Sequence, residues 1–179
     1  MINWGVDDDW RFDYYPLDVG EDAFPLHAQA LRIWRKRGQG GIPAWSDFDL
    51  PMDFEGLWGW LSVYDCIPED PISFDVRLWG TQVAIVSGHD ATRTKLSPAS
   101  AEVRNDASTI TEKDLGFCRF VLDESVIGHQ YGPLRQELGE MVRYEEIVLP
   151  LSSDGITNDK ALFFGVRIDL DDSGLTDRM

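Results

Sequence analysis

The residues that could carry metal or nucleophilic chemistry in this sequence are three histidines and two cysteines. His27, His89 and His129 are far apart along the chain, and none lies in an HExxH, HxH or Cys-paired spacing. Cys66 and Cys118 form no CxxC pair. We therefore expect no metal site and interpret the histidines as ordinary polar residues.

Cys118 is a candidate nucleophile, but its neighbours argue against that role. It falls on the apolar side of a predicted helix with Phe117 and Val121, where a thiol is usually buried and unreactive. The chain has no Gly-x-Ser-x-Gly motif, and the glycines of 38–41 are not followed by the Lys-Ser or Lys-Thr pair of a phosphate-binding loop. The sequence thus predicts no catalytic residues, and we expect that the protein is not an enzyme.

Four bases within six positions stand out in an acidic chain: Arg32, Arg35, Lys36 and Arg37. They occupy one side of a predicted helix whose apolar residues recur on the other side. Two interpretations stay open, a solvated helix face and a docking site for an acidic partner or subunit.

Arg77 lies on the opposite face of a predicted strand from Phe74, Val76 and Leu78. If that face is exposed to solvent, Arg77 is a plain surface residue. If the face meets helices, the guanidinium needs a carboxylate partner or an anionic ligand.

The net charge of this chain limits the classes of partner that it can bind. Its 179 residues include 16 Lys and Arg against 32 Asp and Glu, a formal net charge of −16. Nucleic acids and anionic lipids are recognised through basic surface, so we expect neither a nucleic-acid nor a membrane partner. The N-terminus lacks the features of a signal peptide, and no apolar stretch approaches the ~20 residues that span a bilayer. With only two cysteines, a reducing compartment is indicated, and we expect a cytoplasmic protein.

Sequence patterns predict both helices and strands. Helical spacing predicts helices at 26–37 and 108–124, the second opened by the capping box Thr109-Ile-Thr-Glu112. Residues 81–87 are ambiguous between a strand and a short helix. Asp154-Gly155 is typical of a hairpin turn. Alternating apolar and polar residues predict five strands, at 61–66, 72–79, 126–131, 142–150 and 159–169.

The two ends of the chain differ from its middle. Residues 1–25 combine seven acids with six aromatic residues. This composition predicts either an acidic aromatic arm that packs on the domain or on a partner, or a mobile tail. We expect one domain over 26–170 and an acidic tail at 171–179.

Four motifs follow one another in the chain: Trp45–Pro51, Phe74–Thr81 with its Arg-Leu-x-Gly-Thr end, Gly88–Thr92 with Gly-x-Asp-x-Thr spacing, and Glu146–Gly155 with Leu-Pro-Leu-Ser-x-Asp-Gly. In this order they resemble an alphaproteobacterial family of single-domain PAS-type sensory domains, over about residues 26–167. One departure is Arg93, which stands where the family usually has a glycine.

The resemblance implies an α+β fold: a PAS-like five-stranded antiparallel sheet, helices on one face and an N-terminal helical extension. It makes 81–87 a short helix. It implies a non-catalytic sensory or regulatory function in signal transduction, exerted through a small apolar or amphipathic ligand or through contact with a protein partner, including a homodimer. It also implies a ligand pocket between the sheet and the long helix. The residues expected to line it are Phe74, Val76, Leu78, Cys118, Val121, Tyr131 and Tyr144. In the alternative interpretation, these residues simply fill a packed core.

The sequence indicates no particular cofactor and leaves two alternative functions. A haem would need a histidine on the helix 108–124, which has none, and Gly116–Phe120 lacks the Asn and the Gln-Gly of a flavin-binding core. The cofactor is therefore unknown. The alternatives are a cone-shaped α+β binder or enzyme of the ketosteroid-isomerase type, and a purely structural interaction subunit. The long helix lies between the second and third strands, which favours the sensory interpretation over the cone-shaped class.

Overall fold

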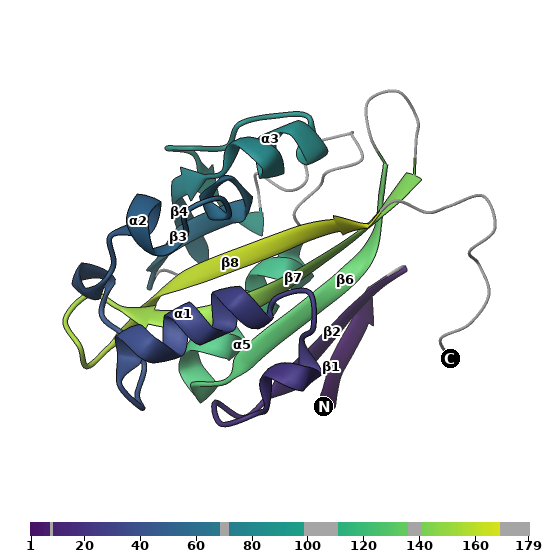
Figure 1. Cartoon of the computed structure of the whole chain (residues 1–179). Coiled ribbons are helices and arrows are strands. Elements are labelled where there is room, and N and C mark those ends of the chain that lie inside the picture. The colour runs from purple at the N-terminus through teal and green to yellow at the C-terminus, as the bar shows by residue number, and fades with distance from the viewer. Residues whose placement is uncertain (8, 69–71, 99–110, 136–140, 169–179) are drawn as a thin grey trace.

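Eight antiparallel strands form one sheet in the computed structural model, which describes residues 1–7, 9–68, 72–98, 111–135 and 141–168. The strand order is β1-β2-β6-β7-β8-β3-β4-β5 (Figure 1). The strands are β1 (Ile2–Asp7), β2 (Trp10–Tyr15), β3 (Leu61–Ile67), β4 (Ser73–Trp79), β5 (Lys95–Leu96), β6 (Ile127–Arg135), β7 (Met141–Ser152) and β8 (Asn158–Ile168).

The expected five-stranded sheet with helices on one face and an N-terminal helical extension is wrong. The five predicted strands correspond to β3, β4, β6, β7 and β8, but β1, β2 and β5 extend the sheet at its two ends. The chain before α1 (Ala28–Gly38) contributes the β1–β2 hairpin instead of an α-helical extension. Strand β2 pairs with β6 from Arg11↔Tyr131 to Tyr15↔Ile127, so the free backbone groups along β6 find partners there. The sequence patterns did not predict this hairpin, because the acidic residues of its strands indicated an arm and not a strand.

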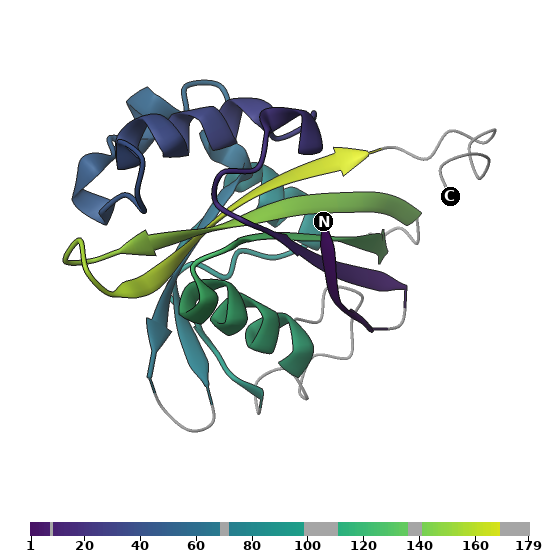
Figure 2. The same cartoon turned by 90° about the horizontal axis from the view of Figure 1, so that it is seen from below.

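Helices cover both faces of the sheet (Figure 2). On one face lie α1 (Ala28–Gly38) and the short α2 (Leu50–Asp53), and on the other lies α5 (Glu112–Glu124). Residues 81–87 form α3 (Thr81–Ser87), as the motif resemblance implies and against the strand propensity of its residues. Three 3₁₀ turns connect these elements, at Glu21–Ala23, Trp45–Asp47 and Trp58–Trp60.

The start of α5 differs from the predicted capping box. Thr111 is the N-cap, and its hydroxyl accepts a hydrogen bond from the Asp114 backbone at 3.2 Å. The Asp114 carboxylate accepts one from the Thr111 backbone in return, at 2.6 Å. The predicted start at Thr109 lies outside the described residues, as does the predicted acidic tail at 171–179.

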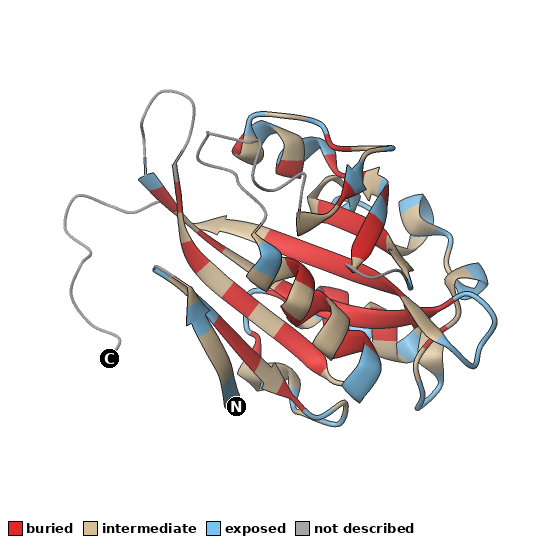
Figure 3. Ribbon diagram, turned by 180° about the vertical axis from the view of Figure 1, so that it is seen from behind, coloured by how far each residue is buried: buried red, intermediate tan, exposed pale blue. Residues whose placement is uncertain are grey.

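Each face of the sheet has its own apolar core, and buried residues run along the central strands beneath α5 (Figure 3). The α5-side core includes Phe74, Phe117 and Val121, and the α1-side core includes Trp34 and Ile147. On the α5 side the helix meets β6 at a glycine: a Cβ atom on Gly128 would lie 2.7 Å from Val121. Helix and strand therefore approach more closely than a larger residue would allow.

Candidate functional site

Three polar side chains lie together on the sheet face that α5 covers. Gln130 of β6 pairs with Glu146 of β7, and Tyr144 precedes Glu146 by two residues on the same strand. Side chains at such positions point to the same face. Gln130 and Tyr144 are buried, each 6% exposed, and Glu146 is partly buried. We call Gln130, Tyr144 and Glu146 the polar triad.

Hydrogen bonds within the polar triad leave two groups unsatisfied. The Gln130 amide nitrogen donates to the Glu146 carboxylate, which orients the Gln130 carbonyl oxygen away from that carboxylate. Among the described residues, the Gln130 carbonyl oxygen has no hydrogen-bond partner, and the Tyr144 hydroxyl has none of good geometry, although it lies close enough to the Glu146 carboxylate to lower the pKa of Glu146. Buried polar atoms are almost always paired, so two unpaired atoms at one place need an explanation.

Burial raises the pKa of Glu146 to about 7. The hydrogen bond from Gln130 opposes this shift, and the nearby carboxylate of Asp114 increases it. Burial also raises the pKa of Asp114 itself. The site therefore holds a carboxyl group that changes charge near neutral pH, in surroundings that favour its neutral form.

Aromatic rings border the polar triad. The ring of Tyr64 stacks on Trp79 with centroids 6.1 Å apart and lies 4.4 Å from the ring of Phe163. Burial raises the pKa of Tyr64 well above its usual value, and Glu146 contributes to that shift. Burial likewise raises the pKa of Cys118 far above its usual value, so the thiol is protonated and unreactive.

The arrangement suits recognition of hydrogen-bond donors. The Gln130 carbonyl and the Glu146 carboxylate are acceptors, and the Tyr144 hydroxyl can donate or accept. A ligand with an apolar or aromatic body and N–H or O–H groups would satisfy them, since such sites combine apolar walls with a few placed polar groups.

The seven predicted ligand-binding residues do not share one face of the sheet. Two of them, Leu78 and Tyr131, lie on the α1 side of the sheet. Alternation along β6 turns Tyr131 away from α5, whereas Leu78 is turned away by the register shift between β3 and β4, which interrupts the alternation that Phe74 and Val76 begin. The other five lie on the α5 side and are buried: Phe74, Val76, Cys118, Val121 and Tyr144.

Several of those five residues fill a packed core. Phe74 and Val121 are fully buried, and Val121 presses on Gly128 of β6. Among the five, only Tyr144 contributes a polar atom to the polar triad. Sequence reasoning missed Gln130 and Glu146, although each is a polar residue within an alternating strand. Only the register of β6 against β7 turns both inward and places them side by side.

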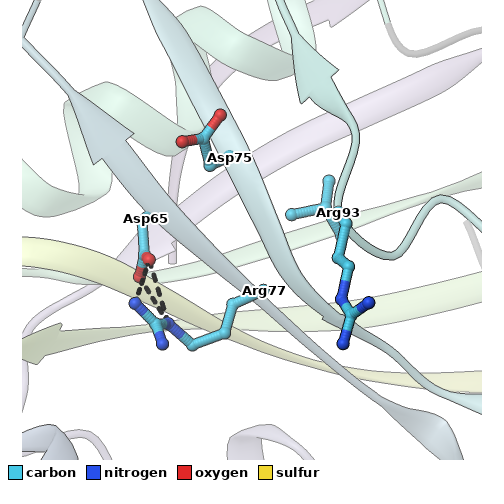
Figure 4. A pocket seen from close by; sticks show the side chains of 5 residues that line it. Asp65, Asp75, Arg77 and Arg93 are labelled. Atoms are coloured by element: carbon cyan, nitrogen blue, oxygen red, sulfur yellow. Dashed lines mark hydrogen bonds and ion pairs between the residues drawn. The ribbon is translucent and has the colours of Figure 1, made fainter.

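A shallow depression of about 510 Å³ lies on the α1 side of the sheet, at β3 and β4 (Figure 4). Arg77 donates there to Asp65, with nitrogen and oxygen 2.5 Å apart, and Lys160 also contacts Asp65 at 2.6 Å. The Arg77 side chain is 47% exposed, so Arg77 is a surface residue of this face, and Asp65 is its carboxylate partner. Arg93 lines the same depression with a left-handed backbone, φ 65°, and is exposed.

The basic residues of α1 make contacts within the chain. Arg32 pairs with Glu21 at 2.7 Å, and Arg37 pairs with Asp53. Arg35 donates to the backbone carbonyls of residues 17 and 19. Lys36 is exposed. Three of the four bases predicted to dock a partner therefore stabilise the position of α1 itself, and docking through this face remains a prediction.

The described residues include no group of three or more His, Cys, Asp or Glu side chains that could hold a metal ion. None of the helices in this part of the chain is long and apolar enough to cross a membrane. Comparisons with protein-family models, with curated proteins and with solved structures give no match to this chain.

Proposed function

We propose that this protein is a non-catalytic sensory or regulatory domain that binds a small amphipathic ligand at the polar triad. The observation that carries the proposal is the pair of unsatisfied buried atoms, the Gln130 carbonyl oxygen and the Tyr144 hydroxyl, beside aromatic rings. A ligand that donates hydrogen bonds from an apolar body would satisfy both atoms. The four sequence motifs that resemble PAS-type sensory domains support the same function, although the eight-stranded sheet departs from the fold they imply.

Native mass spectrometry of protein purified from its own host tests the proposal. A mass above that of the chain, lost on denaturation, would identify a retained ligand. Tyr144→Phe is the decisive variant, because it removes only the hydroxyl. We expect the ligand-free variant to be about as stable as the parent, since this hydroxyl makes no hydrogen bond of good geometry within the chain and loses only its contact with the Glu146 carboxylate. Retention of the ligand should fall.

The matched control is Tyr15→Phe, which removes a hydroxyl on the opposite side of the sheet. It should leave ligand retention unchanged. Equal retention in Tyr144→Phe and the parent, or no retained molecule in the parent, would contradict the proposal. If the parent retains no molecule, the regulatory function would have to be exerted through contact with a protein partner or with a second copy of this chain.

Acid–base catalysis by Glu146 is a second candidate, and one observation favours it. A buried carboxyl whose pKa is about 7 is matched to proton transfer at neutral pH. The test is to incubate the parent in D₂O with the molecule that mass spectrometry identifies. Deuterium entering a carbon position of that molecule, and not doing so with Glu146→Gln, would favour catalysis over sensing.

A further inference from the structure

A second polar row crosses the sheet on its α1 side, opposite the polar triad. Asp13 of β2 pairs directly with His129 of β6. The Nε2 atom of His129 lies 3.8 Å from an oxygen of Glu145 on β7. Three neighbouring strands thus contribute Asp13, His129 and Glu145, which we call the α1-side row.

Asp13 is the unusual member of the α1-side row, because its side chain is fully buried. Its Oδ1 atom accepts a hydrogen bond from the Asn3 amide at 3.0 Å. Its Oδ2 atom has no partner among the described residues. A buried carboxylate is costly unless it is paired with a charge or fully hydrogen-bonded, and one neutral amide does neither.

His129 presents a second unsatisfied atom to the same place. Its Nε2 side faces Glu145, and this contact is the largest cause lowering the pKa of the Glu145 carboxyl. With the ring proton on Nε2, the Nδ1 atom is an acceptor. Nδ1 is buried and has no partner among the described residues. Asp13 and His129 therefore stand opposite each other on neighbouring strands, and each presents a hydrogen-bond acceptor, Asp13 Oδ2 and His129 Nδ1. Neither acceptor has a donor among the described residues.

The neighbouring base is already engaged, because Arg143 pairs with Glu145 at 2.6 Å. Among the described residues, no ion pair or hydrogen bond reaches Asp13 Oδ2. Aromatic rings surround His129, with centroids at 5.0 Å for Tyr131 and 5.7 Å for Phe24. A cation with N–H groups is the kind of ligand that a carboxylate and aromatic faces recognise together.

We propose that Asp13 and His129 form a binding site for the ammonium group of a small primary amine. One N–H would donate to Asp13 Oδ2 and a second to His129 Nδ1. The side chains of His129 and Glu145 each remain 13% exposed, so the α1-side row reaches the surface at that end. The site is on the other face of the sheet from the polar triad and does not depend on the function proposed for it.

Nuclear magnetic resonance of the full chain with ¹⁵N-labelled histidine tests the site directly. Methylammonium is the probe, and tetramethylammonium is its control, because it has the same charge but no N–H group. Methylammonium should shift the Nδ1 resonance of His129 towards that of a hydrogen-bonded acceptor, in a saturable way. Tetramethylammonium should not. Equal shifts with both cations, or none with methylammonium, would overturn the proposal.

Asp13→Asn should weaken methylammonium binding at least about tenfold, since it removes the charge at nearly constant shape. Asp123→Asn is the control, because it removes an exposed acid from α5. If Asp13→Asn does not fold, His129→Gln should show the same loss, read from the ¹⁵N resonances of His27, whose ring lies 6.0 Å from position 129 in the parent. Unchanged binding in the variant that folds would overturn the site. A crystal structure of protein grown in methylammonium that shows a water molecule, and no methylammonium, between Asp13 Oδ2 and His129 Nδ1 would also overturn the site.

Discussion

The hydroxyl of Tyr144 occupies the space above Gly165, where a Cβ atom would lie 1.8 Å from the tyrosine oxygen. Gly165 belongs to β8 and pairs with Glu146, so this glycine leaves room for one member of the polar triad beside another. The geometry of the candidate site therefore depends on a residue without a side chain in the neighbouring strand.

Gly165→Ala should displace the ring of Tyr144 and destabilise the protein by about 1–3 kcal/mol, the usual cost of overpacking a core. Urea denaturation gives the free energy of unfolding. Gly116→Ala is the matched control: among the described residues its new Cβ would meet only Trp4, at 3.8 Å, and alanine favours the helix. The control should be neutral or stabilising. Equal losses in both variants would contradict the packing of Tyr144 on Gly165.

Glu146→Gln should stabilise the protein at high pH and have little effect at low pH. The pKa of Glu146 is raised from 4.5 to about 7, so the folded state binds a proton that the unfolded state releases over this range. The parent therefore loses stability as the pH rises through the range, by up to about 3 kcal/mol. Unfolding free energies of both proteins should diverge from about pH 4.5 to about pH 7. A constant difference would show that Glu146 is not buried as described.

His27 should make the fold sensitive to acid. The side chain is 1% exposed, and burial lowers its pKa from 6.5 to about 4. Between these values the unfolded state binds a proton that the folded state excludes, so stability falls as the pH falls, by up to about 3 kcal/mol. His27→Gln retains a donor for the Glu145 carbonyl, which lies 3.3 Å from Nε2. Its stability should fall less steeply in acid, and an unchanged slope would refute this.

Arg93→Gly should stabilise the protein by up to about 1 kcal/mol, because glycine adopts a left-handed backbone without steric cost. The backbone N–H of Arg93 donates to the Val76 carbonyl at 2.8 Å, and glycine retains that bond. Arg93→Ala is the control: it removes the guanidinium but keeps the left-handed Cβ. If both variants change the melting temperature equally, the side chain and not the backbone decides stability at this turn.

The local elements of this protein follow from its sequence. Alternation of apolar and polar residues predicted the central strands, and helical spacing predicted α1 and α5 to within a few residues. Both patterns arise because one side of each element is buried, so they can be read without knowing what covers it. The β1–β2 hairpin was missed because its acidic residues favoured an arm over a strand.

Only the tertiary structure decided what the polar residues do. Gln130 and Glu146 are sixteen positions apart, and Asp13 and His129 are more than a hundred apart; pairing of their strands brings each pair together. A shift of one residue in register would turn these side chains to the other face. Register depends on contacts across the whole sheet, including the unexpected β2–β6 pairing. For that reason the residues of both candidate sites could be assigned only from the folded chain.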